Sequence, residues 1–312
     1  MGAPAVVSLF SGAGGLDLGF MQEGFDLVWA NDFDADAVET YRANIGNHIV
    51  LGDISRIPVK EIPGCNVIIG GFPCQGFSQA NTHKVVDDKR NLLYRQYLRV
   101  LRSKRPEVFV AENVRGILSL EGGTAIKRIV SDFTETGYRV QHRLLNAADY
   151  GVPQTRQRVI IVGVRSDVER DFSYPEPTHA KDGRGGLPAW MSMRDALSEI
   201  PDPDGADAGT VPNNEYSRYK VAPRNYTGHR LSDPNKPSPT ILARGNGGGG
   251  VCAIPHYSGT RRLSVRESAT IQTFPTDFVF HGRLGSCYRQ VGNAVPVLLA
   301  RAVARQVKAV LE

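Results

Sequence analysis

The first half of the chain alternates short apolar runs with segments of helical periodicity. The apolar runs, typical of buried strands, are 5–10, 26–31, 67–69, 108–111 and 159–164. The segments with helical spacing are 15–23, 34–44, 92–103 and 124–135. Strands that alternate with helices form βαβ units, so we predict an α/β fold with a mostly parallel sheet.

The pattern changes after about residue 166. Residues 173–260 are rich in proline, glycine, aspartate and asparagine, and 193–200 is their one convincing helical stretch. Scattered tyrosine, isoleucine and valine side chains would anchor a small irregular domain there. Helical periodicity returns at 265–274 and, most clearly, at 296–311. We expect the last helix to pack back on the first domain.

Composition is that of a soluble globular enzyme, with 41% hydrophobic and 22% charged residues. The apolar stretch 3–10 is too short to span a membrane, and no basic segment precedes it as in a secretory signal, so a cytoplasmic location is expected. The four cysteines form no C-x-x-C pair, so no zinc site is predicted. The net charge of +5 is compatible with a polyanionic partner without requiring one.

Cys74 lies in the segment Gly-Gly-Phe-Pro-Cys-Gln-Gly-Phe-Ser, residues 70–78, directly after an apolar run. Open α/β sheets place their chemistry at the carboxyl ends of the strands. A lone cysteine is usually a small buried hydrophobic residue. The glycine, proline, glutamine and serine neighbours favour a loop instead, which makes Cys74 a candidate nucleophile.

A second candidate site begins with the glycine-rich turn in residues 8–19, between the first strand and the first helix. Its glycines are spaced G-x-G-G, which does not fit the G-x-G-x-x-G dinucleotide pattern. Asp32 and Asp53 follow the next two strands. Each alone is typical of a helix cap or a turn. Together they describe an adenosine site, in which Asp32 would accept the ribose hydroxyls and Asp53 an adenine amine.

Polar residues at two further strands complete the candidate site. Glu112 is expected just past a buried strand, on the same sheet edge as Cys74, as an ion-pair partner, a cap or a contact to a heterocyclic substrate. Gln154, Arg156 and Arg158 alternate at the start of another strand and therefore share one face. They would be solvated there, or would line the site and bind a phosphate or a carbonyl oxygen.

These motifs together resemble those of the DNA (cytosine-5) methyltransferases, in the order usual for that family and over nearly the whole chain. The matching segments are Phe10–Gly15, Pro73–Gln75, Glu112–Val114, Gln154–Arg158, Arg262–Glu267 and Gly292–Pro296. The resemblance implies a Rossmann-like, S-adenosylmethionine-dependent methyltransferase domain that needs no metal.

The same resemblance implies roles for individual residues. Cys74 would add to C6 of cytosine, Glu112 would contact N3 and the 4-amino group, and Arg158 would hold O2. Arg156 would support the nucleophile or a neighbouring phosphate. The residues expected around the cofactor are Phe10, Gly12, Gly14, Leu16, Asp32, Phe33, Asp53, Ile54, Pro73, Leu93 and Asn293. Asp32 is a departure, because the family commonly has glutamate at the ribose position.

Duplex DNA is the expected partner. By resemblance, residues 1–175 and 285–312 form the catalytic domain and residues 176–284 a target-recognition domain. Residues 75–93 look like the family's mobile loop, which would close on a flipped-out base. Ser238–Ala243 resembles the family's threonine-containing recognition motif. The residues expected to contact DNA are Gln75, Ser78, Arg90, Thr240, Arg244 and Asn246.

Three alternatives stay open from the sequence: a transfer-RNA cytosine methyltransferase of the same superfamily, a catalytically silent DNA-binding relative, and a nucleotide-dependent oxidoreductase. The Gly71–Ser78 segment favours the DNA branch over the RNA branch. We expect a monomer of prokaryotic or phage type, since no regulatory extension precedes Val7, and a cognate restriction endonuclease acting separately is a compatible partner. The recognition sequence cannot be deduced.

Overall fold

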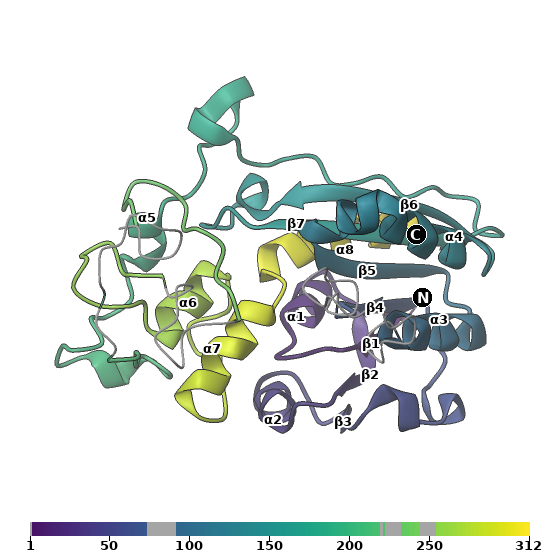
Figure 1. Ribbon diagram of the computed structural model, residues 1–312, viewed down its shortest axis with the longest axis horizontal. Coiled ribbons are helices and arrows are strands. Elements are labelled where there is room, and N and C mark those ends of the chain that lie inside the picture. The colour runs from purple at the N-terminus through teal and green to yellow at the C-terminus, as the bar shows by residue number, and fades with distance from the viewer. Residues whose placement is uncertain (1, 74–91, 219–220, 222–231, 244–253) are drawn as a thin grey trace.

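The computed structural model describes residues 2–73, 92–218, 221, 232–243 and 254–312 (Figure 1). Its centre is a seven-stranded sheet with the order β3-β2-β1-β4-β5-β7-β6. The strands are β1 (Ala5–Leu9), β2 (Asp26–Asp32), β3 (Ile49–Leu51), β4 (Val67–Gly70), β5 (Val108–Val114), β6 (Tyr138–Asn146) and β7 (Gln157–Arg165). The pairs from β3 to β5 are parallel, which confirms the mostly parallel sheet.

β7 is the antiparallel element of the sheet. It pairs antiparallel with β5 on one side and with β6 on the other. The start of β7 therefore lies at the edge where β5 ends, with Arg158 paired to Val114. This reversal brings residues from the beginning of β7 to the carboxyl ends of the parallel strands.

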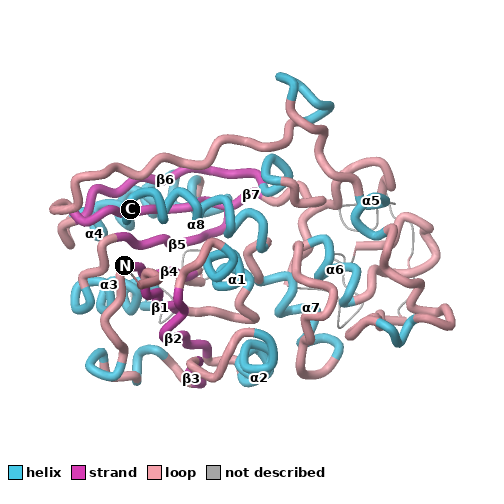
Figure 2. Tube along the Cα trace, turned by 180° about the vertical axis from the view of Figure 1, so that it is seen from behind, coloured by secondary structure: helices cyan, strands magenta, loops and turns pink. Residues whose placement is uncertain are grey.

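Helices cover both faces of the sheet (Figures 1 and 2). The helices of the sheet-containing part are α1 (Gly15–Gln22), α2 (Ala35–Asn44), α3 (Leu92–Lys104), α4 (Thr124–Thr134) and α8 (Val297–Leu311). Three further helices, α5 (Met193–Leu197), α6 (Val265–Ile271) and α7 (Leu284–Asn293), lie to one side of the sheet. One apolar core joins α1 and α8 to the sheet, and another joins α3 and α4 to its opposite face. The strands alternate between the two cores, as a sheet buried on both faces requires.

The last helix returns to the first, as expected. Leu299 and Val303 of α8 share a core with Phe20 of α1. Gly19 allows this close approach, because a Cβ atom there would lie 2.4 Å from the Cβ of Ala300. Residues from the two ends of the chain thus complete one structural layer.

The remaining part is irregular and has a core of its own, beside α7 in Figure 1. α5 and α6 contribute Met193 and Val265 to this core, and Ile241 reaches it from a segment without regular structure. Leu18 of α1 also belongs to the core, so the irregular part packs directly on the sheet-containing part. The predicted limits at residues 176 and 284 stay a prediction.

The structure also contains elements that the hydrophobic pattern did not predict. These are β6 and α7, whereas β3 is the strand expected before Asp53. β5 is longer than expected and includes Glu112, which was predicted to lie just past the strand.

Candidate active site

A cavity of about 1100 Å³ opens at the carboxyl ends of β1, β2, β4 and β5. The sequence-predicted residues that line it are Phe10, Gly12, Leu16, Asp32, Phe33, Asp53, Ile54, Pro73, Leu93, Glu112, Arg158 and Asn293. They come from segments nearly 300 residues apart. The structure therefore brings the predicted adenosine site and two of the predicted catalytic residues to one space.

The glycine-rich turn enters this cavity from β1. Phe10 and Gly12 have positive φ angles of 56° and 55°. Gly14, the residue before α1, has a φ of 86°, and a Cβ atom there would lie 2.1 Å from Ile45 Cδ1. Only glycine fits at position 14 without displacing Ile45. Gly14 shapes the turn from beneath but does not itself line the cavity.

The carboxylates of Asp32 and Asp53 both accept hydrogen bonds from backbone amides at the cavity. Asp32 accepts hydrogen bonds from the amides of Gly12 at 2.8 Å and Asp34 at 2.9 Å. Burial raises the pKa of the Asp32 carboxyl, although these hydrogen bonds oppose the shift. Asp53 accepts from the Ser55 amide at 2.9 Å, and this bond lowers its pKa. Asp53 thus caps the short helix Ile54–Arg56, and Asp32 stabilises the turn to Asp34. Both also line the cavity, so the two interpretations of the sequence are compatible.

Asp17 was missed in the sequence, whereas Phe33 was expected at the cofactor site, although its high exposure was not. Asp17 lies within α1, is fully buried, and also lines the cavity. Burial raises the pKa of Asp17 to about 6, and the Tyr41 hydroxyl donates a hydrogen bond to it at 2.9 Å. The Phe33 ring is 73% exposed, an unusual state for a large aromatic side chain. An aspartate between two leucines in a helix gives no local signal of such burial.

Glu112 and Arg158 form an ion pair at the cavity wall. Glu112 Oε1 lies 2.7 Å from Arg158 Nε, and the two residues are 9% and 8% exposed. The reversed direction of β7 makes this contact possible, since Arg158 starts that strand where β5 ends. A Cβ atom at Gly71 would lie 2.8 Å from Glu112 Oε2, so the chain leading to Cys74 passes directly against the glutamate.

Asn113 also holds the segment that leads to Cys74. Its Nδ2 donates to the carbonyl of Phe72 at 3.0 Å, and Asn113 is 2% exposed. Residues 71–73 therefore follow a defined path along the cavity wall. Cys74 itself lies outside the described residues, as do Gln75, Ser78, Arg90, Arg244 and Asn246.

Gln154 and Arg156 are placed differently from what the sequence suggested. Both are fully buried, and neither lines the cavity. Arg156 donates to the carbonyls of Ile241, Gly292 and Ala294 at 2.7, 2.8 and 2.9 Å. The solvated interpretation is wrong for both residues, and a DNA phosphate could reach Arg156 only after these bonds broke. Arg158 alone of the three faces the cavity.

Comparison with known proteins identifies the family. Residues 5–309 match the model of the C-5 cytosine-specific DNA methylase family. The chain belongs to this family. It is 42% identical over 316 residues to the Type II methyltransferase M.NgoFVII of Neisseria gonorrhoeae, covering 94% of this chain and 83% of the relative. It is 39% identical to M.BspRI of Lysinibacillus sphaericus, with 97% and 81% covered.

Solved structures agree with this assignment. A prophage-encoded DNA modification methyltransferase from E. coli superimposes with a TM-score of 0.76 at 25% identity, over 99% of both chains. The S. pombe Dnmt2 methyltransferase superimposes with a TM-score of 0.71 at 19% identity and shares the fold. The family assignment identifies the chain as a DNA cytosine-5 methyltransferase and supports DNA over the RNA alternative. It also implies use of S-adenosylmethionine.

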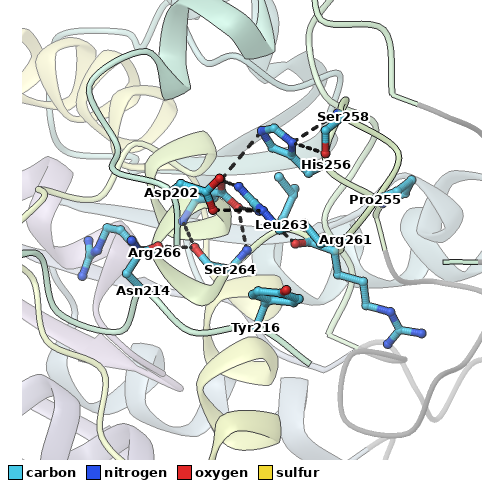
Figure 3. Close-up of polar contacts among 12 residues, drawn as sticks. Asp202, Asn214, Tyr216, Pro255, His256, Ser258, Arg261, Leu263, Ser264 and Arg266 are labelled. Carbon is cyan, nitrogen blue, oxygen red and sulfur yellow. Dashed lines mark hydrogen bonds and ion pairs between the residues drawn. The ribbon is translucent and has the colours of Figure 1, made fainter. Parts of the chain in front are cut away.

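The methylase motif Arg262–Glu267 organises the irregular part of the molecule (Figure 3). Ser264 caps α6 and forms a reciprocal capping box with Glu267. Two nitrogens of Arg261 contact the two Glu267 oxygens at 2.8 Å each. Arg266 is fully buried and donates to the carbonyls of Pro212 and Pro275 at 3.0 and 2.8 Å. These contacts hold segments that lack secondary structure.

Thr240 belongs to the same irregular part of the methylase. Its hydroxyl donates to the carbonyl of Thr155 at 2.8 Å.

Within the residues that the structure describes, no group of three histidine, cysteine, aspartate or glutamate side chains could hold a metal ion. The helices of those same residues include none long and apolar enough to cross a membrane.

Proposed function

We propose that this methylase transfers the methyl group of S-adenosylmethionine to C5 of a cytosine flipped out of a short, specific duplex DNA sequence. The observation that carries the proposal is the position of the Glu112–Arg158 pair in the same cavity as Asp32 and Asp53. A base and an adenosine-containing donor can thus be bound side by side.

The residues of the cavity suit S-adenosylmethionine, which carries a net positive charge. Asp17, Asp32 and Asp53 line the cavity and form no ion pair among the described residues. This excess of negative charge favours a cationic ligand. The exposed Phe33 ring offers a face on which an adenine could stack.

In the proposed cofactor site, Asp32 binds the ribose hydroxyls and Asp53 the adenine amine, with Phe10, Gly12, Gly14, Leu16, Phe33, Ile54, Pro73, Leu93 and Asn293 forming or shaping the walls. The shorter Asp32 side chain is already bound to two backbone amides, which fixes the carboxylate near the turn. When bound, the cofactor supplies an electrophilic methyl group.

The catalytic step that we propose begins at Cys74. Its thiolate adds to C6 of the cytosine, and C5 becomes nucleophilic enough to take the methyl group. Glu112 holds N3 and the 4-amino group, and Arg158 holds O2. Loss of the C5 proton to a base then expels the Cys74 thiolate and restores the aromatic ring. A fixed pair of opposite charges is suited to holding the cytosine, because it does not need to reorganise during the reaction.

DNA binding involves the irregular part, which we propose is the target-recognition domain of residues 176–284, inserted into a catalytic domain of residues 1–175 and 285–312. Thr240, Arg244 and Asn246 would read or position the target, and Gln75, Ser78 and Arg90 would contact the DNA around the flipped base. Flipping a base costs a few kcal/mol, which such contacts offset.

The proposed nucleophile is tested with Cys74→Ser. We expect loss of tritium transfer from labelled S-adenosylmethionine to duplex DNA, while cofactor binding measured by calorimetry is retained. A Cys65→Ser variant is the matched control, because Cys65 lies outside the cavity. Normal turnover by Cys74→Ser would overturn the assignment.

Substrate and site are tested together by bisulfite sequencing of DNA treated with the purified protein. One short motif with a protected cytosine is the expected result, and protection without any shared motif would contradict sequence-specific recognition.

We further propose a cytoplasmic monomer that needs no metal and is accompanied by a separate restriction endonuclease of the same specificity. Sedimentation of the protein alone tests whether it is a monomer. Unchanged activity after EDTA treatment tests whether it needs no metal. An extract of the source cell that cleaves unmethylated DNA, but not DNA treated with the methylase, would support the separate endonuclease.

A further inference from the structure

A buried junction joins three segments that lie far apart in the sequence. Its side chains are Gln154, Arg156 and Gln272, each fully buried. Gln154 Nε2 donates to Gln272 Oε1 at 2.8 Å, and Gln154 Oε1 accepts from the Ile241 amide at 2.8 Å. Gln272 in turn donates to the carbonyl of Val291 at 2.7 Å. The junction thus links the start of β7 to the recognition segment and to the end of α7.

Arg156 is the centre of the junction. It donates to Ile241 on the recognition side and to Gly292 and Ala294 on the other. A guanidinium removed from water is costly unless it is well paired, and burial lowers the pKa of Arg156 well below its usual value. An arginine kept there at such a cost fixes its three partners relative to one another.

Gly292 removes the remaining freedom between the two sides. A Cβ atom at this position would lie 2.4 Å from the nitrogen of Ala243 and 2.5 Å from the carbonyl carbon of Leu242. The two backbones are therefore in direct contact. Asn293 follows and lines the cavity, whereas Ala243 immediately precedes the predicted base-reading residues.

We propose that this junction couples DNA recognition to cofactor binding, with Arg156 and Gly292 as positioning residues. The inference rests on the proposed cofactor and DNA sites. Because the two backbones are in contact, DNA that moves residues 241–243 must also move residues 292–294. A cofactor that fixes Asn293 limits the positions open to the recognition segment. Thermodynamic linkage requires the effect to be equal in both directions.

The test measures the dissociation constant for the cognate duplex with and without S-adenosylhomocysteine, in the parent and in Gly292→Ala and Arg156→Lys. We expect S-adenosylhomocysteine, the product of methyl transfer, to tighten DNA binding by about 5-fold to 150-fold in the parent, the usual range for coupled sites. The variants should reduce this factor to less than about 3-fold. Arg156→Lys, at a residue outside the cavity, should leave cofactor affinity in the absence of DNA nearly unchanged, whereas Gly292 itself lines the cavity. Retention of the parent factor by both variants would overturn the proposal.

Matched controls separate coupling from general damage. Gly64→Ala adds a Cβ where no atom lies within 4 Å, and Arg170→Lys changes an exposed arginine that also donates to a carbonyl, that of Ala309. Both should keep the parent coupling factor.

Hydrogen exchange in the parent gives a second measurement that needs no variant. We expect S-adenosylhomocysteine alone to slow exchange at the Ile241 amide, although this residue does not line the cavity. Unchanged exchange at saturation contradicts the coupling. Failure of the parent to bind S-adenosylhomocysteine or DNA at all would instead refute the proposed function, and with it the role of the junction.

Discussion

The Glu112–Arg158 pair lies in a wall nearly closed to solvent, where the two charges neutralise each other before any base arrives. Removing one member of such a pair leaves the other charge uncompensated. Substitutions at Glu112 must therefore preserve its shape and its ability to accept from Arg158. Glutamine keeps the shape and one oxygen that can accept from Arg158, but it removes the negative charge that compensates Arg158.

We predict that Glu112→Gln slows covalent addition to cytosine by about 10²-fold to 10⁴-fold, the usual contribution of a positioned acid or base. Cofactor affinity should change little. Adduct formation with DNA containing 5-fluorocytosine measures the first quantity and calorimetry the second. Equal rates of adduct formation in variant and parent would refute the role of the carboxylate.

Asp17 makes the stability of the protein depend on pH. Its pKa rises from 3.8 to about 6 because burial penalises the ionised form. The folded state therefore holds this proton more tightly than the unfolded state. Below about pH 4 both states are protonated and no penalty exists, whereas above about pH 6 the full penalty of roughly 3 kcal/mol applies.

Asp17→Asn removes this penalty and keeps an oxygen that can accept from Tyr41. Relative to the parent, the free energy of unfolding of the variant should rise between pH 4 and pH 7 by up to about 3 kcal/mol. Urea denaturation at a series of pH values measures it. A difference that stays constant with pH would show that Asp17 does not titrate in this range.

How much of the site could be predicted follows from the kind of partner that each residue has. Asp32, Asp53, Glu112 and Arg158 lie at or near the ends of strands, where open α/β sheets place their sites, so such positions are recognisable. Arg156 belongs to the same motif, yet its partners are backbone carbonyls of distant segments. Carbonyls are present at every residue and leave no trace in a sequence, so its structural role could not be deduced.

At the level of elements, the apolar runs predicted most of the sheet because strands buried on both faces are continuously hydrophobic. β6 was missed because several of its side chains are exposed and polar. α7 buries polar residues and a glycine, such as Ser286, Gln290 and Gly292, so its buried face has no clear hydrophobic period. The direction of β7 could not be predicted either, because nothing in its residues specifies that it runs antiparallel to its neighbours.

The contact between α1 and α8 depends on a single small residue. Gly19→Ala would place a Cβ 2.4 Å from Ala300 Cβ and 2.5 Å from the Arg301 nitrogen. We predict destabilisation of about 1–3 kcal/mol, as in other overpacked cores, measured by urea denaturation. Gly64→Ala, with open space around it, should differ little from the parent. Equal stability of the two variants would contradict the close approach.

At the scale of the whole molecule, a basic protein with a net charge of +5 combines a cavity at the edge of the sheet with an irregular part that we propose reads DNA. Binding to a polyanion releases counterions, and the effect grows with the number of phosphates contacted. The charge therefore bears on the affinity for DNA more than on the choice of sequence.

We predict that raising salt from about 50 mM to 200 mM weakens DNA binding roughly 10²-fold to 10³-fold, as expected for about five phosphate contacts. Fluorescence anisotropy with a labelled duplex gives the slope. Affinity for S-adenosylhomocysteine, measured over the same range, is the control and should stay nearly constant. A flat response for DNA would argue against phosphate binding.

The junction around Arg156 also bears on how such enzymes can acquire new specificities. On the recognition side, its described polar contacts are with main-chain atoms: the amide and carbonyl of Ile241. Every amino acid except proline provides both. Apart from Thr240, whose hydroxyl donates to the Thr155 carbonyl, side chains of the proposed recognition segment can therefore change without breaking these hydrogen bonds. If the segment reads DNA as proposed, one catalytic domain serves different DNA sequences, and the constraint lies in the path of the backbone.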